Sequence, residues 1–215
     1  MKFSHNKFHL TNMKLIIAIT CFGIWTCAFA SYVPYMSEKC LEVKPMKTFR
    51  PAKFFKETWY VTQAKNGTVA TVCHKYKAKK ERSGNLVFDY GYYDNGNGDP
   101  FFQVHCRETK RKGTKQFSFK CELIKGQESS NFKQYSVDLT FIDTDYDNYA
   151  IFYRCVPIPK MGYADNFLVL QRKIKSKKSD AINKRIKQIL FKKQSVCLSD
   201  FIDRKNSNCK KNSNF

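Results

Sequence analysis

The chain has 215 residues, with 39 Lys and Arg against 18 Asp and Glu, and its formal net charge is +21. This length suits one domain with an appendage, and a hydrophobic content of 42% excludes a mostly disordered chain. After the N-terminus, no apolar run reaches the length of a membrane span. Nine cysteines are too many for an ordinary cytosolic protein of this size and indicate an oxidising compartment.

The N-terminus has the pattern of a secretory signal peptide. An apolar run over residues 15–30 follows Lys14 and ends in Ala-Phe-Ala, the small-residue pattern of a signal-peptidase site. The residues before Met13 are polar, so Met13 is an alternative start. A membrane anchor is the other interpretation, and a run of only about 16 residues disfavours it. We predict that residues 1–30 are removed and that the protein is secreted.

The body of the chain, residues 31–172, has the pattern of consecutive β-strands. Aromatic and β-branched runs alternate with turn signals such as Asn66-Gly67 and Ser83-Gly84. Short loops between eight strands favour an all-β, up-and-down antiparallel barrel, which has no open edges. The predicted strands lie near residues 57–63, 69–79, 85–93, 101–109, 115–125, 133–142, 149–157 and 166–172.

One pair of cysteines supports this register. Cys106 and Cys121 are equidistant from a point beside Gly113, where a hairpin turn is expected. In an antiparallel pair they would face each other closely enough to form a disulfide. The alternative is two unrelated buried thiols, which the secreted context disfavours.

Residues 173–215 form a basic tail with a predicted amphipathic helix. From residue 171 to the end there are 14 Lys and Arg against 3 Asp and Glu. After Ser179, the expected N-cap, an apolar stripe follows at helical spacing. The stripe consists of Ile182, Ile186, Ile189 and Leu190, and the basic positions are Lys184, Arg185, Lys187, Lys192 and Lys193. A solvated helix is one interpretation, and docking on anionic phospholipid, with the stripe packed on the barrel, is the other.

Three segments resemble the signatures of the lipocalin family. Residues 54–61, Phe-Phe-Lys-Glu-Thr-Trp-Tyr-Val, are similar to the first signature, residues 143–149 to the second, and Arg172 to the third. Glu57 stands where the usual pattern has glycine, which puts the local turn in doubt. Over residues 38–172 the chain is most similar to the salivary lipocalins of blood-feeding triatomine bugs, the group of triabin, pallidipin and nitrophorin.

The resemblance also implies structural pairs. It implies a disulfide between Cys40 and Cys155 and another between Cys73 and a C-terminal cysteine. Cys209 matches the nitrophorin-like end better than Cys197 does, which leaves Cys197 as the odd thiol, although spacing alone also permits Cys73–Cys197. The first and third signatures further suggest that Trp59 and Arg172 close one end of the barrel through a cation–π contact of about 0.5–2 kcal/mol.

Few residues carry catalytic or cofactor chemistry. Only His74 and His105 follow the predicted signal peptide, and the sequence lacks zinc-site spacing, a phosphate-binding loop and a nucleophile elbow. We therefore expect no enzymatic activity and no metal. In nitrophorins a strand histidine binds haem iron, and Gly91 falls at the matching position here. Because haem needs an axial donor, we expect no haem, with His105 as a less favoured substitute donor.

An eight-stranded barrel is wide enough to hold one small ligand. From strand alternation and family matching, the candidate ligand-binding residues are Phe88, Asp89, Tyr90, Phe117, Phe119, Tyr135, Val137, Phe152, Arg154, Leu168 and Leu170. On the third strand, alternation places Phe88 and Tyr90 inside, whereas family matching places Asp89 inside, and a bulge at Gly91 would reconcile the two. Plain core packing is the alternative at each position. Separately, Asn66 lies in an N-glycosylation sequon.

The resemblance implies two functions. In the first, the protein impairs haemostasis and inhibits platelet aggregation by binding an eicosanoid, adenine nucleotide or biogenic amine in the barrel. An inward Arg154 favours an anionic ligand, whereas an inward Asp89 would favour an amine. In the second, the outer surface of the barrel inhibits a protein target of clotting or platelet activation, such as a host protease, collagen or the platelet surface. We expect a monomer without specific nucleic-acid binding.

Overall fold

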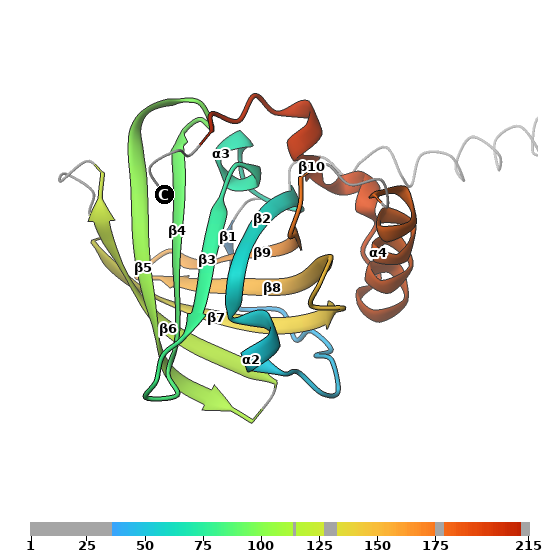
Figure 1. The fold of residues 1–215 in the computed structure, drawn as a ribbon, viewed down its shortest axis with the longest axis horizontal. Helices are drawn as coiled ribbons and strands as arrows, with labels where there is room; N and C mark the ends of the chain where they lie inside the picture. The colour runs from blue at the N-terminus through green and yellow to red at the C-terminus, as the bar shows by residue number, and fades with distance from the viewer. Residues whose placement is uncertain (1–35, 114, 127–132, 175–178, 212–215) are drawn as a thin grey trace, which may run out of the picture. The chain divides into compact units, whose positions relative to one another are not determined.

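The structure, a computed structural model, describes residues 36–113, 115–126, 133–174 and 179–211. These residues form a closed antiparallel barrel with a helix against its outside (Figure 1). The predicted signal peptide lies outside the described residues. Within the described ranges, no helix is both long and apolar enough to cross a membrane.

Eight strands make the barrel and follow one another in chain order. They are β2 (Lys56–Ala64), β3 (Lys75–Lys80), β4 (Leu86–Asp94), β5 (Gly98–Lys112), β6 (Gln116–Lys125), β7 (Gln134–Thr144), β8 (Tyr149–Ile158) and β9 (Gly162–Gln171). Pairing of β9 with β2 closes the barrel. The remaining elements are β1 (Met36–Ser37), α2 (Pro51–Phe54), α3 (Val69–Val72), α4 (Ser179–Gln194), η1 (Leu198–Asp200), β10 (Ile202–Asp203) and η2 (Arg204–Asn206). The predicted fold class is therefore confirmed.

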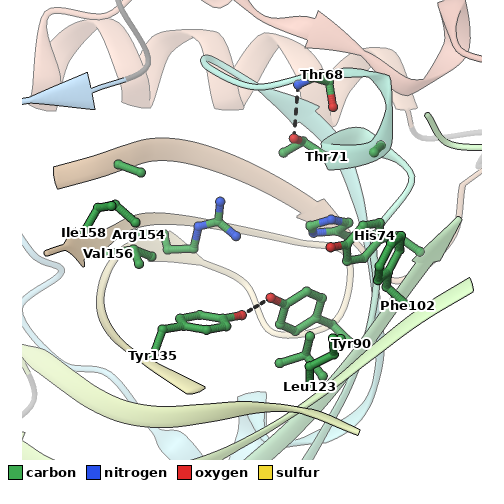
Figure 2. Close-up of a pocket in the computed structure, with 14 residues that line it drawn as sticks. Thr68, Thr71, His74, Tyr90, Phe102, Leu123, Tyr135, Arg154, Val156 and Ile158 are labelled. Atoms are coloured by element: carbon green, nitrogen blue, oxygen red, sulfur yellow. Dashed lines mark hydrogen bonds between the residues drawn. The ribbon is translucent and has the colours of Figure 1, made fainter. Parts of the chain in front are cut away.

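One predicted strand, residues 69–79, is wrong in its first half. The chain forms α3 there, and β3 begins only at Lys75. Gly67 has a φ of 111°, and the backbone N–H of Thr68 donates to the hydroxyl of Thr71 at 3.2 Å (Figure 2). This hydrogen bond stabilises the first turn of a helix. Local turn chemistry thus overrides the β-propensity of Val69 and Val72.

An aromatic cluster fills one end of the barrel. The rings of Phe49 and Phe141 stack with centroids 3.9 Å apart, and Phe54 stacks on Trp59 at 5.0 Å. The guanidinium of Arg172 lies 3.6 Å from the Trp59 ring centroid, which confirms the predicted cation–π contact. This end of the barrel is therefore closed by core packing.

Arg172 also satisfies backbone groups around this closed end. Its guanidinium donates to the carbonyl oxygens of Thr58 at 3.2 Å, Tyr146 at 3.1 Å, and Lys53 and Phe54 at 3.4 Å each. These carbonyls belong to α2, to β2 and to the turn between β7 and β8. Arg172 therefore joins parts of the chain that are far apart in sequence.

Helix α4 packs on the outer face of the barrel. Ile186 and Leu190 are fully buried, and Ile182 and Ile189 pack beside them. Their partners are Ile142, Tyr149, Ile151, Tyr153, Phe167 and Val169 on β7, β8 and β9. The predicted apolar stripe therefore faces the barrel.

Three disulfides join cysteines of the described residues, and they are the expected pairs. Cys106 faces Cys121 across β5 and β6, and this pair lies inside the barrel. A second joins Cys73 to Cys209 in the tail, whereas Cys197 is free and exposed.

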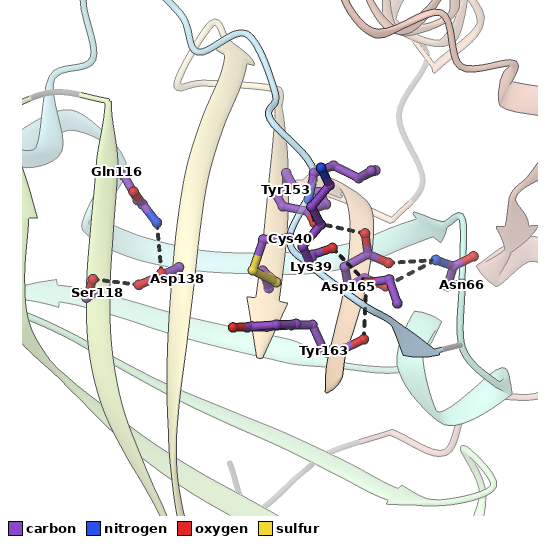
Figure 3. The surroundings of a disulfide bond; sticks show 12 residues. Lys39, Cys40, Asn66, Gln116, Ser118, Asp138, Tyr153, Tyr163 and Asp165 are labelled. Carbon is purple, nitrogen blue, oxygen red and sulfur yellow. Dashed lines mark hydrogen bonds between the residues drawn. A yellow bond between two sulfur atoms is a disulfide. The ribbon is translucent and has the colours of Figure 1, made fainter. Parts of the chain in front are cut away.

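The third disulfide, Cys40–Cys155, fastens the N-terminal segment to the outside of β8 (Figure 3). Beside it, the buried carboxylate of Asp165 accepts a hydrogen bond from the Tyr153 hydroxyl at 2.8 Å. The side-chain amide of Asn66 donates to the Asp165 carbonyl at 3.1 Å. The sequon nitrogen is thus engaged within the fold, and glycosylation of Asn66 stays a prediction.

Glu57 explains why the first lipocalin signature usually has glycine at this position. Its φ is 116°, a region that costs a residue with a side chain about 1–3 kcal/mol and costs glycine little. We expect Glu57→Gly to raise the free energy of unfolding by about 1 kcal/mol, measured by urea denaturation. The matched control is Lys56→Gly at the neighbouring strand position, which should lower stability by about 0.5–1 kcal/mol. A loss for both variants would contradict the strain argument.

Candidate functional site: a cavity in the barrel

The barrel contains a cavity of about 420 Å³ away from the aromatic closed end. Figure 2 shows its polar side chains converging from different sides of the barrel. The lining residues are Thr68, Ala70, Thr71, His74, Tyr90, Tyr92, Phe102, Val104, Leu123, Tyr135, Arg154, Val156, Ile158 and Ala164. The walls are thus mainly apolar and aromatic, with a few polar groups, as is typical of small-molecule sites.

The predicted ligand-binding residues divide between this cavity and the core. Tyr90, Tyr135 and Arg154 line the cavity. The side chains of Phe88, Phe152 and Leu170 surround only a void of about 10 Å³ beside Phe54 and Phe55. The other inward positions are buried in the core, namely Phe117, Phe119, Val137 and Leu168. Alternation therefore predicted which side chains face inward but not which of them leave space for a ligand.

Asp89 is not in the cavity, which corrects the family-based placement. Its carboxylate lies 2.6 Å from Nδ1 of His105, and both side chains are partly exposed on the outside of β4 and β5. The bulge at Gly91 that would have reconciled the two placements is not present, because Gly91 pairs in regular register with Lys75 and Gln103. With no shift at Gly91, strict alternation keeps Asp89 outside. The described cavity lining consequently contains no Asp or Glu.

His74 is the main cavity residue that the sequence analysis missed. It follows Cys73, which is bonded to the tail, and its ring lies 4.5 Å from the ring of Tyr92 and 5.1 Å from that of Tyr90. The signal was the alternation of β3, because His74 has the same parity as Tyr76 and Ala78, which belong to the core inside the barrel. Gly91 and His105 do not line the cavity, and the absence of haem stays a prediction.

The tail supports the wall of the cavity at His74. Arg204 donates from its guanidinium to the carbonyl oxygens of Val72 at 2.7 Å and Val61 at 3.3 Å. The Cys73–Cys209 disulfide fixes the same corner, where α3 meets β3. The end of the chain therefore forms a second layer behind α3 and His74.

Among the described residues that line the cavity, one side chain is cationic at neutral pH. Burial lowers the pKa of His74 well below its ordinary value, with smaller contributions from Arg154 and Arg204. The hydroxyls of Tyr90 and Tyr135 are hydrogen-bonded to each other. Burial raises the pKa of Tyr135 to about 12 and also raises that of Tyr90. The imidazole is thus neutral and both phenols are protonated, so Arg154 carries the charge.

The buried imidazole makes stability depend on pH. Nδ1 of His74 has no hydrogen-bond partner, and its pKa is lower in the folded than in the unfolded chain. Below about pH 6.5 the unfolded chain therefore binds the extra proton, and this contribution to stability is lost as the pH falls toward the lowered pKa. We expect His74→Gln to reduce this loss, measured by urea unfolding at about pH 7 and about pH 5. An unchanged loss in the variant would contradict the assignment.

Comparison with known proteins identifies the family. The Triabin family model matches residues 31–185. Triafestin-1 of Triatoma infestans is 38% identical over 168 residues, which cover 75% of this chain and 80% of that protein. Pallidipin of Meccus pallidipennis is 32% identical over 204 residues, covering 92% and 98%.

The fold is also found among solved structures. The tryptamine complex of the amine-binding protein of Rhodnius prolixus aligns with a TM-score of 0.65 at 20% identity, covering 80% of this chain and 90% of that one. At this identity the likeness concerns the fold. Together with the matches in sequence and the eight-stranded barrel, it leads to one assignment. The chain belongs to the triabin family of lipocalins.

Proposed function

We propose that the protein is a secreted lipocalin that impairs haemostasis by sequestering a small mediator with one negative charge and a long apolar body. A monocarboxylic eicosanoid has this chemistry. Inhibition of platelet aggregation would follow from removal of the mediator. The observation that carries the proposal is the single guanidinium of Arg154 in a cavity walled by aromatic and aliphatic side chains.

The charge balance of the cavity discriminates between the three ligand classes. A carboxylate would gain a charge-assisted, two-pronged hydrogen bond from Arg154, with the hydroxyls of Tyr90 and Tyr135 nearby. A nucleotide carries several negative charges, for which one guanidinium is too little. A protonated amine would be buried beside a cation without a carboxylate to pair with. These arguments favour the eicosanoid over the nucleotide and the amine.

Calorimetry of the delipidated protein tests the proposal with one representative of each class. We expect a prostanoid carboxylate to bind with one-to-one stoichiometry, and ADP and tryptamine to release no binding heat. Binding of ADP or tryptamine without the prostanoid would contradict the proposed charge preference.

The alternative is an inhibitor that binds a protein target through the outside of the barrel. It is favoured by a row of basic side chains across three strands: Lys79 on β3, Arg107 on β5 and Lys120 on β6, joined through Val87 on β4. All three basic residues are exposed. Such a row fits an acidic protein surface. A protein that binds none of the three small molecules would direct the search to this surface.

A further inference from the structure

We propose that the outer face of α4 docks the protein on membranes that expose anionic phospholipid. This inference does not depend on a ligand in the barrel. The face, called the α4 outer face below, consists of Lys184, Lys187, Phe191 and Lys192. All four side chains are exposed.

Phe191 is the unusual residue of this face. The inner side of α4 buries Ile186 and Leu190 completely, whereas the Phe191 side chain, a large aromatic, is 63% exposed. It belongs to neither apolar cluster of the barrel. Lys187 lies one helical turn before Phe191 and Lys184 lies two turns before it. Phe191 therefore projects from among lysines, on the side of the helix opposite to the barrel.

Two other basic residues of the helix hold it in this orientation. Arg185 donates from Nε to the Tyr149 hydroxyl at 2.8 Å. Lys193 donates from Nζ to Asp143 at 2.8 Å, and to the carbonyl oxygen of Ile142 at 3.1 Å. The predicted set of five docking residues is thereby reduced, because these two serve as anchors to the barrel.

The charges around this face favour an anionic partner. Asp180, in the first turn of α4, is the acidic residue of the helix, and three lysines outnumber it. At the C-terminal end of α4, the backbone of Lys44 exchanges hydrogen bonds with the Gln194 side chain, and Lys44 is exposed as well. The α4 outer face is therefore positively charged and fixed to the barrel, and it is complementary to an anionic membrane leaflet.

The aromatic ring favours a membrane over a soluble polyanion. In an interfacial helix, lysines contact the headgroups while an aromatic side chain enters the acyl boundary. A polyanion such as heparin offers no apolar phase, so an exposed Phe would add little to its binding. The combination of Phe191 with Lys184, Lys187 and Lys192 thus matches a phospholipid surface.

Co-sedimentation with vesicles tests the charged part of the face. The full protein should bind vesicles of equal phosphatidylcholine and phosphatidylserine, and not phosphatidylcholine alone. Each lysine near an anionic surface contributes about a fivefold gain, so Lys184→Gln/Lys187→Gln/Lys192→Gln should lower the partition coefficient about 100-fold. The matched control Lys80→Gln/Lys110→Gln/Lys112→Gln removes three exposed lysines from the barrel strands. A loss in this control as large as in the α4 variant would overturn the proposal.

Phe191→Ser tests the apolar part and separates a membrane from a polyanion. We expect about a tenfold weaker partition into phosphatidylserine vesicles and unchanged retention on heparin. The control is Ile124→Ser, which removes another side chain that is about half exposed. Full vesicle binding by Phe191→Ser would show electrostatic adsorption alone and overturn the membrane assignment. As a second measurement, Phe191→Trp should shift its emission to the blue on these vesicles and not with heparin.

Discussion

Replacing Arg154 by Met is expected to weaken binding of a monocarboxylic eicosanoid by about 100-fold. Arg154 supplies the positive charge of the cavity, since His74 is neutral and both tyrosines are protonated. Removing one partner of a buried, hydrogen-bonded charge pair costs about 2–5 kcal/mol, which corresponds to this loss. Isothermal titration of the delipidated variant gives the affinity.

The stability of the ligand-free protein should not suffer from the same substitution. Burying a guanidinium has a desolvation cost, and an apolar side chain of similar length avoids it. We therefore expect that Arg154→Met does not lower the melting temperature of the ligand-free protein. The charge-matched control is Arg107→Gln, which removes a cation paired with Glu81 on the outside of the barrel and should leave ligand binding intact. Carboxylate binding by Arg154→Met within threefold of the parent would rule out Arg154 as the anion partner.

Replacing Arg172 by Ala is expected to lower the free energy of unfolding by about 3–4 kcal/mol. The substitution removes the cation–π contact with Trp59, worth about 0.5–2 kcal/mol. It also leaves the carbonyl groups of Thr58 and Tyr146 without their charged donor, and such unsatisfied groups cost about 1–3 kcal/mol each when buried. Guanidinium denaturation with the disulfides intact measures the change.

Two further variants separate the shape of the Arg172 side chain from its charge. Arg172→Lys keeps the positive charge, but an ammonium group cannot donate to several carbonyl groups at once as the planar guanidinium does. We therefore expect this variant to lose about half as much free energy of unfolding as Arg172→Ala. Arg82→Ala, an exposed position, should change stability by less than about 0.5 kcal/mol. A loss below about 1 kcal/mol for Arg172→Ala would show that core packing alone closes this end of the barrel.

Sequence periodicity predicted the barrel well because its strands are half buried and regular. The Cys106–Cys121 pair set the register of one hairpin correctly, because equal spacing from Gly113 makes the two residues opposite neighbours. Helix α3 was missed because its decisive interactions are local hydrogen bonds between Thr68 and Thr71, which β-propensity does not report. At Glu57 the glycine of the family pattern put the local turn in doubt, but the glutamate side chain itself gives no sign of the positive φ that the structure shows.

The site was harder to predict than the fold. Arg154 was placed correctly because Cys155 is tied to the N-terminal segment and must face outward. Phe88 and Tyr90 share one face of β4, yet only Tyr90 borders the large cavity. Whether an inward side chain borders the cavity or the core depends on how aromatic rings from other strands fill the closed end of the barrel. The alternation pattern of one strand does not contain this information. Family matching predicted an inward Asp89, and this placement failed because a shared motif does not fix the direction of a side chain.

The position of Cys209 has a consequence for the order in which the wall of the cavity is completed during biosynthesis. The chain is synthesised from its N-terminus, so the segment with Arg204 and Cys209 is made after all eight barrel strands. By then β2 to β9 have all been synthesised, and the Cys40–Cys155 and Cys106–Cys121 pairs are available for oxidation. The layer behind α3 and His74 is added only when Cys209 reaches Cys73. A nascent chain can therefore close its barrel before it completes the wall of its cavity, which requires the segment that carries Cys209.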